Sequence, residues 1–149
     1  MYLDPSSFVK ESSVPNWLLK TEPSTYSYDD LERDRETVWD GVTNNLALKH
    51  IRSMKNGDVA FIYHTGDEKS IVGIAQVSSD PMPDPRKKDP KLVVIRLKPK
   101  EKLRRAVPLS EVRSIKDLAD FPLVRLPRLS VMPVTPAQWS TLLAMAKPR

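Results

Sequence analysis

Trp17-Leu18-Leu19-Lys20-Thr21-Glu22-Pro23 is the stretch that decides the fold. A short apolar run that enters polar residues and stops at proline is typical of a buried strand. Residues 1–15 mix proline, serine and charge without periodicity, so we expect a poorly ordered lead-in before this strand. A chain of 149 residues is long enough for one core without disulfides, and we expect a single domain over 16–147.

Helix and strand signals follow without a regular repeat. Good N-caps at Ser27, Ser110 and Thr135 predict helices over about 28–34, 111–115 and 136–145, and helical spacing adds 44–54 with Gly57 as its stop. Strand-like runs occupy 59–64, 70–77, 92–97 and 129–134; the first two read as a hairpin, and the proline-rich run 81–90 as a projecting loop. This order favours an α/β fold of the α+β kind, a curved mixed sheet or open β-barrel flanked by short helices.

The composition favours a polyanionic partner. The 24 Lys and Arg outnumber the 19 Asp and Glu, giving a net charge of +5, although a solvated basic surface explains the same charge. Cysteine is absent, and His50 and His64 lack metal-site spacing, so we expect no metal and no cofactor. No window is apolar enough to span a membrane and no leader pattern opens the chain, so we expect an intracellular monomer, cytoplasmic or, in a eukaryote, nuclear.

Sequence signals for catalysis are weak. The chain lacks G-x-G-x-x-G, P-loop, G-x-S-x-G and S-x-x-K motifs. His64 with Asp40 or Asp58 and a serine forms a conceivable triad, but composition alone makes such a coincidence common. We therefore expect a protein that is not an enzyme. A small nucleotide-processing enzyme that uses His64 and a nearby carboxylate as acid and base is the alternative.

Trp39-Asp40-Gly41 is the local grouping best suited to recognise a base. A tryptophan face stacks on any base, and a carboxylate or an amide such as Asn44 hydrogen-bonds a base edge that has left the duplex. Taken alone, the motif fits a core tryptophan followed by a turn better. We expect Trp17 and Trp139 to be buried and Trp39 to have a face open to a cavity. Tyr26 and Tyr28 fit ligand contact and turn packing equally well.

Two basic stretches are candidates for contacts with phosphate oxygens. Such contacts position a strand without reading its sequence. Solvated loops that only aid solubility explain the same residues equally well. The candidates are Arg86, Lys87 and Lys88 in the first stretch and Lys98, Lys100, Arg104 and Arg105 in the second.

Ordered motifs extend over nearly the whole chain. After 17–23 come Tyr26-Ser27-Tyr28-Asp29-Asp30-Leu31, Trp39-Asp40-Gly41-Val42, Met54-Lys55-Asn56-Gly57-Asp58, Tyr63-His64-Thr65, Ile71-Val72-Gly73-Ile74 and Arg128-Leu129-Ser130-Val131 with Pro133-Val134-Thr135. Together these motifs resemble the EVE domain family. The resemblance implies a PUA-like fold and a pocket for a modified base. Thr43 and Leu48 depart from the family pattern, which has arginine at both positions.

The resemblance also implies which residues surround the pocket. Trp39 would stack on the base, Asp40 or Asn44 would read its edge, and backbone groups near Thr21 and Ser130 would complete the contacts. The full set is Lys20, Thr21, Trp39, Asp40, Asn44, His64, Leu129 and Ser130. The implied function is a non-catalytic module that recognises a modified base in DNA or RNA through an aromatic-lined pocket. A general RNA-binding domain without preference for modification is a further alternative.

Overall fold

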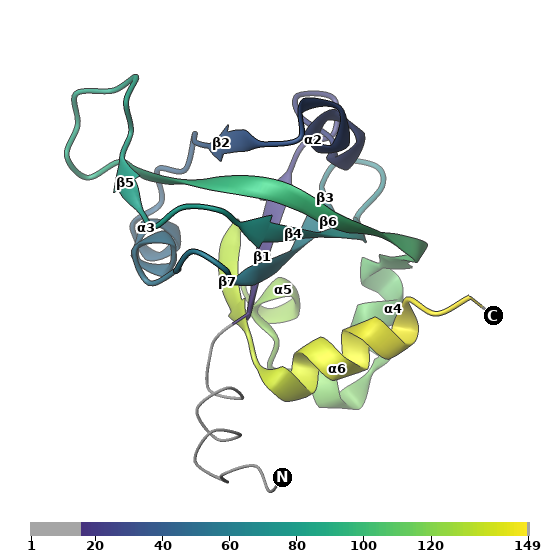
Figure 1. Cartoon of the computed structure of the whole chain (residues 1–149). Helices are drawn as coiled ribbons and strands as arrows, with labels where there is room; N and C mark the ends of the chain where they lie inside the picture. Colours follow the sequence, from purple (N-terminus) through teal and green to yellow (C-terminus); the bar gives the residue numbers. More distant parts are fainter. Residues whose placement is uncertain (1–15, 149) are drawn as a thin grey trace, which may run out of the picture.

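A curved mixed sheet forms the centre of the molecule (Figure 1). The structure, a computed structural model, describes residues 16–148, so the expected lead-in over 1–15 lies outside the described residues. The strand order is β2-β6-β4-β3-β1-β7, with β5 paired to β6 beside this path. The strands are β1 (Asn16–Thr21), β2 (Thr37–Trp39), β3 (Val59–His64), β4 (Ser70–Val77), β5 (Met82–Pro83), β6 (Val93–Pro108) and β7 (Val131–Val134). The predicted curved mixed sheet is confirmed.

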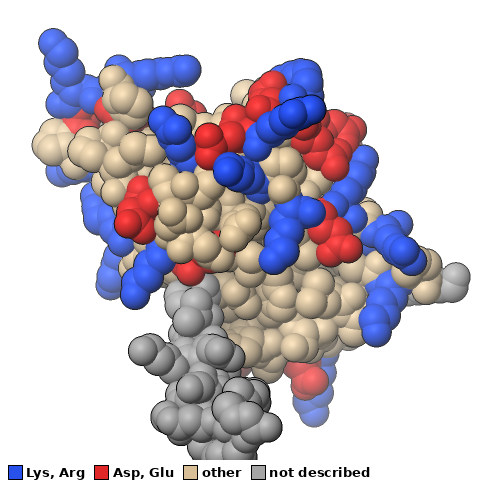
Figure 2. All heavy atoms as spheres, in the orientation of Figure 1, with Lys and Arg blue, Asp and Glu red and all other residues tan. Residues whose placement is uncertain are grey.

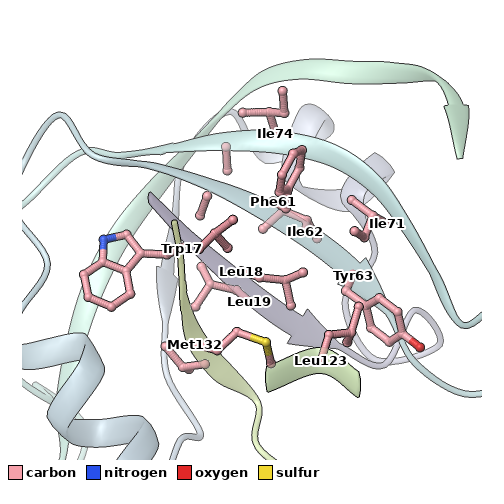
Figure 3. Packing of buried hydrophobic residues seen from close by; sticks show 14 of the residues in the cluster. Trp17, Leu18, Leu19, Phe61, Ile62, Tyr63, Ile71, Ile74, Leu123 and Met132 are labelled. Carbon is pink, nitrogen blue, oxygen red and sulfur yellow. The ribbon is translucent and has the colours of Figure 1, made fainter. Parts of the chain in front are cut away.

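β1 lies inside the sheet and is paired along both edges. It runs parallel to β3 and antiparallel to β7. Trp17, Leu18 and Leu19 are all buried (Figure 3), so both faces of the strand, to which successive side chains point, are covered. The indole Nε1–H of Trp17 donates to the carboxylate of Asp58 at 3.0 Å, so the one polar group of this run keeps a partner inside the protein. The prediction of a buried strand at this position is confirmed.

β6 is the element that departs furthest from the sequence pattern. The predicted hairpin of β3 and β4 is present, but β6 continues for 16 residues and includes the basic stretch 98–105, where the pattern predicts a loop. The pairing of β4 with β6 shifts register between Ile74 and Ala75, and Ala75 is the partner of Pro99. A strand tolerates proline at an irregularity of this kind. Charged side chains on the solvent side of the strand make this stretch read as a loop in the sequence.

Short helices flank the sheet, and α4, α5 and α6 lie together on one side of it (Figure 1). Ser27 and Thr135 cap α2 and α6 as predicted, each in a reciprocal capping box with the residue three positions later. The helices are α2 (Tyr28–Asp34), α3 (Asn45–Arg52), α4 (Leu109–Ser114), α5 (Pro122–Arg125), α6 (Pro136–Met145) and the 3-10 turn η1 (Lys116–Leu118).

Two predicted helix boundaries are wrong. Ser110 is not an N-cap, because α4 begins at Leu109 directly after β6 and Pro108 occupies the cap position without a side-chain bond. α3 ends at Arg52, so Gly57 does not stop it. Gly57 instead lies in the turn before β3 with φ 101°, a backbone conformation that glycine adopts without strain. The pattern also misses β2, β5 and α5, which are too short for a recognisable period.

The proline-rich run forms a loop between β4 and β6, as predicted, and we call residues 84–92 the projecting loop (upper left in Figure 1). β5 pairs with the start of β6 at its base. Asp84 is buried there, and its carboxylate accepts a hydrogen bond from the backbone N–H of Arg86 at 2.8 Å. The base of the loop is therefore fixed, and Arg86 leaves it from a defined position.

Two of the three tryptophans differ from expectation. Trp17 is 2% exposed, as predicted, but Trp39 is only 8% exposed, which makes it more buried than Trp139. Trp139 stacks on Phe61 with ring centroids 3.9 Å apart, and it stays partly open to solvent because α6 covers the core from outside. An open indole face is therefore not available at Trp39.

Tyr28 holds α2 on the sheet. Its ring is 1% exposed, and its hydroxyl donates to the backbone oxygen of Ile74 at 2.7 Å. Burial raises the pKa of Tyr28 to about 12, so the phenol is a donor at neutral pH. The ring lies against Gly73, where a Cβ atom would come within 2.4 Å of a ring carbon. Glycine is therefore required at position 73 by this close approach.

We expect Gly73→Ala to lower the free energy of unfolding by about 1–3 kcal/mol, because the added methyl group overlaps the Tyr28 ring. Urea unfolding followed by circular dichroism measures the change. In a Tyr28→Ala background the methyl group has room, and the cost should fall close to zero. An equal cost in both backgrounds would show that the contact is not its cause.

Candidate functional site

A cavity of about 660 Å³ opens where β1 ends, and we call it the β1 cavity. Its walls come from four places in the chain: the end of β1 with the turn after it, β2 with the residues that follow, the projecting loop, and the residue before β7. The lining residues are Lys20, Thr21, Thr25, Tyr26, Glu36, Thr37, Val38, Trp39, Asp40, Gly41, Val42, Arg86 and Ser130.

Backbone pairing positions the polar wall of the β1 cavity. The N–H of Lys20 donates to the carbonyl oxygen of Ser130 at 2.9 Å, which joins the end of β1 to the residue before β7. The ammonium of Lys20 donates to the carbonyl oxygen of Pro127 at 2.8 Å, and its partial burial lowers the pKa of Lys20. An ammonium has three donors, so two remain for a ligand.

The aromatic wall is formed by Tyr26 and Trp39. Their rings meet edge to face, with centroids 6.3 Å apart and an interplanar angle of 83°. Tyr26 is fixed at both ends, because its carbonyl oxygen accepts from the hydroxyl of Thr21 at 2.7 Å and its own hydroxyl donates to Asp34 at 2.9 Å. The half-buried Tyr26 therefore presents a rigid ring, which loses little side-chain entropy when a ligand binds.

Charged residues stand at the rim. Asp40 follows β2 and is exposed, and its carboxylate lies 4.0 Å from the guanidinium of Arg86, whose side chain is 83% exposed. An ion pair this open contributes little to stability. Both side chains are free to turn toward a molecule that enters the cavity.

The structure brings together five of the residues that the resemblance implies: Lys20, Thr21, Trp39, Asp40 and Ser130. Asn44 and Leu129 lie elsewhere. The side-chain oxygen of Asn44 accepts from the N–H of Ala47 and caps α3, and Leu129 is 6% exposed in the core. Asn44 thus has a structural role in capping a helix and Leu129 one in the core, and neither role requires a ligand.

His64 also lies outside the β1 cavity. It is 7% exposed, and its Nε2 accepts from the backbone N–H of Tyr28 at 3.0 Å, a donor in the first turn of α2. Because Nε2 accepts, the proton of the neutral ring lies on Nδ1, which is 3.1 Å from the carboxylate of Glu68. Both nitrogens have structural partners, so His64 has no free atom for proton transfer to a ligand.

Most of the predicted phosphate-contacting residues are exposed. Arg86, Lys87 and Lys88 lie on the projecting loop, where Figure 2 shows basic side chains extending from the surface, and Lys98, Lys100 and Arg104 lie on β6. Arg105 is different: its guanidinium pairs with the carboxylate of Glu111 and donates to the carbonyl oxygen of Met145 at 2.8 Å. Arg105 therefore ties β6 to α4 and α6.

Tyr26, Val38 and Arg86 are cavity residues that the sequence does not single out as such. Tyr26 fits packing and ligand contact equally well, and Arg86 belongs to a basic run whose other members face solvent. The signal that could have found Val38 is the β-branched and aromatic run Thr37-Val38-Trp39, which suits a strand although it is only three residues long.

Two further observations concern residues 16–148. No helix among them is long and apolar enough to cross a bilayer. Within the same residues, no group of three or more His, Asp or Glu side chains is arranged to hold a metal ion.

Comparison with known proteins gives similarity over most of the chain. The EVE domain family model matches residues 15–145. An NMR structure of a protein from Rhodopseudomonas palustris has a TM-score of 0.85 at 38% identity, covering 89% of this chain and 93% of that one. Thymocyte nuclear protein 1 of Gallus gallus is 29% identical over an alignment of 164 positions that covers 87% of this chain and 68% of the relative. The crystal structure of human THYN1 in complex with 5-methylcytosine containing DNA has a TM-score of 0.84 at 27% identity, covering 91% and 99%.

We expect His64→Phe to lower the free energy of unfolding by about 1–3 kcal/mol, because the ring is kept but the Tyr28 N–H loses its acceptor. Chemical denaturation measures the change. Glu68→Gln is the matched control: it alters only the exposed partner and should cost about 0.5 kcal/mol or less. A His64→Phe protein as stable as the parent would remove the structural role assigned to this histidine.

Proposed function

The chain belongs to the EVE domain family, and on that premise we propose that it is a binding module that recognises a modified base in nucleic acid. Human THYN1, whose similarity covers 91% of this chain, is the protein whose structure contains 5-methylcytosine DNA. That base is therefore the first ligand to test here. We place it in the β1 cavity, and the rigid aromatic wall of that cavity is the observation that carries the proposal.

The size and the aromatic wall of the β1 cavity support a base as the ligand. A volume of about 660 Å³ is within the range of small-molecule sites. Tyr26 and Trp39 meet at right angles, so the exposed part of each ring offers apolar area to a base that has left its stack. Because Trp39 is only 8% exposed, we assign the larger stacking contribution to Tyr26 and a packing contribution to Trp39.

The polar wall supplies groups that match a base edge. The carboxylate of Asp40 is an acceptor, as the exocyclic amino group of cytosine requires. The ammonium of Lys20 is a donor that suits a ring nitrogen or carbonyl oxygen, and Ser130 contributes a further polar group at the same wall. The aromatic wall contacts the face of a base. The acceptor and the donors beside it contact the hydrogen-bonding edge, so they can distinguish one base from another.

The exposed cations support contact with the sugar–phosphate backbone. Lys87 and Lys88 extend from the projecting loop, and Arg86 on the same loop lines the cavity. A strand whose base enters the β1 cavity would therefore pass this loop. Such contacts add affinity without sequence preference. Lys98, Lys100 and Arg104 extend the same charge along β6, whereas Arg105 is engaged within the protein.

We propose no chemistry for the module. The residue that an acid–base mechanism would use, His64, is buried and holds the first turn of α2 with its Nε2. It also lies outside the β1 cavity. The proposed activity is binding, and its measurable quantity is the ratio of affinities for modified and unmodified nucleic acid.

We expect Tyr26→Leu to weaken binding to a DNA duplex with one 5-methylcytosine by roughly tenfold or more, since base stacking on an aromatic ring is worth about 1–3 kcal/mol. Fluorescence anisotropy with labelled duplexes measures this. Tyr26→Phe is the matched control, because it keeps the ring and removes only the hydroxyl group, which bonds to Asp34 and Thr37.

Tyr26→Phe should bind nearly as well as the parent. If Tyr26→Leu binds as tightly as Tyr26→Phe, the base does not occupy the β1 cavity. If the parent binds duplexes with and without 5-methylcytosine equally, the protein is a general nucleic-acid binder.

We expect Lys87→Glu with Lys88→Glu to weaken binding to modified and unmodified duplexes by the same factor and to flatten the dependence of affinity on salt, because these residues act on phosphates. Lys116 and Lys147, also exposed but on other elements, are the control pair for the same reversal. Equal losses in both variants would show that only net charge matters.

A further inference from the structure

A second hollow, of about 270 Å³, lies on the other side of Lys20 from the β1 cavity. Its walls come from the ends of β1 and β3, the turn between β3 and β4, α4 and the segment around α5. We call it the basic hollow, because three of its residues are the cations Lys20, Lys69 and Arg113. A further hollow of about 280 Å³ shares Lys69 and Arg113 with it.

The three cations are not neutralised within the described part of the chain. None of Lys20, Lys69 and Arg113 forms an ion pair with a carboxylate there. Among residues 16–148, no acidic residue lines the basic hollow itself. Two carboxylates lie beside it and have partners of their own: Glu68 of the adjoining hollow is 3.1 Å from Nδ1 of His64, and Glu22 accepts from the hydroxyl of Thr65 at 2.9 Å. Unpaired cations that converge on one concave surface favour an anion there.

Tyr63 adds a buried donor to the basic hollow. The residue is 4% exposed, and within residues 16–148 its hydroxyl has no hydrogen-bond partner. No polar side-chain atom of these residues is both fully buried and unpaired, so this hydroxyl reaches the surface of the hollow. Figure 3 shows it pointing away from the core, beside Leu123. Burial raises the pKa of Tyr63, which keeps the phenol protonated and able to donate.

The fold fixes the ammonium of Lys20 and the backbone that carries the other two cations. The ammonium of Lys20 bonds to the carbonyl oxygen of Pro127 and lies 5.7 Å from the centre of the Tyr63 ring. The carbonyl oxygen of Lys69 accepts from the N–H of Leu109 at 2.7 Å, which joins the β3–β4 turn to the start of α4, the helix that carries Arg113. Lys69 has φ 44°, a conformation that costs energy and persists only because surrounding bonds hold it.

We propose that the basic hollow binds a backbone phosphate of the strand whose modified base enters the β1 cavity. This inference rests on the proposed function. Lys20 lines both the β1 cavity and the basic hollow, so a base and a phosphate bound in them are separated by one side chain. The phosphate receives hydrogen bonds from the Tyr63 hydroxyl and the Lys20 ammonium, and charge from Lys69 and Arg113.

The test compares two double variants that remove the same charge. The test variant is Lys69→Gln with Arg113→Gln. The control is Lys116→Gln with Arg125→Gln, whose residues are exposed and line neither the β1 cavity nor the basic hollow. Anisotropy titrations use duplexes with 5-methylcytosine, with unmodified cytosine, and with uncharged methylphosphonate linkages beside the 5-methylcytosine. We expect the first variant to bind both charged duplexes roughly tenfold more weakly than the control, with a salt slope smaller by about 1.

On the methylphosphonate duplex the two double variants should bind alike, because the phosphate that distinguishes them is gone. Tyr63→Phe should weaken binding to charged duplexes by several-fold and leave the melting temperature unchanged, since the lost hydroxyl has no partner in the described structure. The proposal is overturned if Lys69→Gln with Arg113→Gln matches the control on every duplex, or if its deficit persists on the methylphosphonate duplex.

Two further outcomes separate the strand-phosphate site from a site for free phosphate and from the proposed recognition of a modified base. If inorganic phosphate raises the melting temperature of the parent but not of Lys69→Gln with Arg113→Gln, while both bind duplexes equally, the hollow takes free phosphate and the strand assignment is wrong. If the parent shows no preference for 5-methylcytosine but the phosphate results hold on the unmodified duplex, base recognition fails and the phosphate site stands. A parent that binds neither duplex overturns both.

Discussion

The pairing of β1 along both of its edges is the constraint on which the rest of the structure depends. Burial of Trp17, Leu18 and Leu19 holds this strand between β3 and β7, and the last β1 residues then emerge at one edge of the core. Lys20 is bonded there to Ser130 through the backbone, and it faces a cavity on either side. The candidate site is thus a consequence of where an apolar strand stops.

Local signals in the sequence were sufficient for the first strand, one hairpin and two helix caps, but not for the start of α4 or the end of α3. The run at 17–19, the hairpin of β3 and β4, and the caps Ser27 and Thr135 each depend on neighbouring residues, and all are confirmed. The length of β6 was not predictable, because its charges and Pro99 read as a loop until β4 supplies a partner. The same limit applies to the site. His64 and Asn44 have the chemistry of ligand-binding residues, but packing against α2 and the start of α3 gives them other partners.

Acidic and basic side chains lie side by side around α2 (Figure 2). Acidic residues gather on α2, which carries Asp29, Asp30, Glu32 and Asp34, and Figure 2 shows this group beside scattered basic side chains. The projecting loop, in contrast, carries Arg86 with the two lysines after it. The acidic side chains of α2 are largely paired with cations, Asp30 and Asp34 with Arg33 and Asp29 with Lys102, so the exposed cations of the projecting loop are the ones that favour contact with a polyanion.

The single long strand β6 restricts where residues can be inserted into the chain. β6 pairs with β2, β4 and β5 and leads into α4 without an intervening loop. A one-residue insertion within it would reverse which side chains face the core and displace α4 at the same time. Length variation is tolerated where the backbone leaves the sheet, and the projecting loop is such a place. Insertions that the fold accepts are therefore best placed in residues 87–90, away from the buried Asp84 at the base of the loop, and they would change how Lys87 and Lys88 are presented.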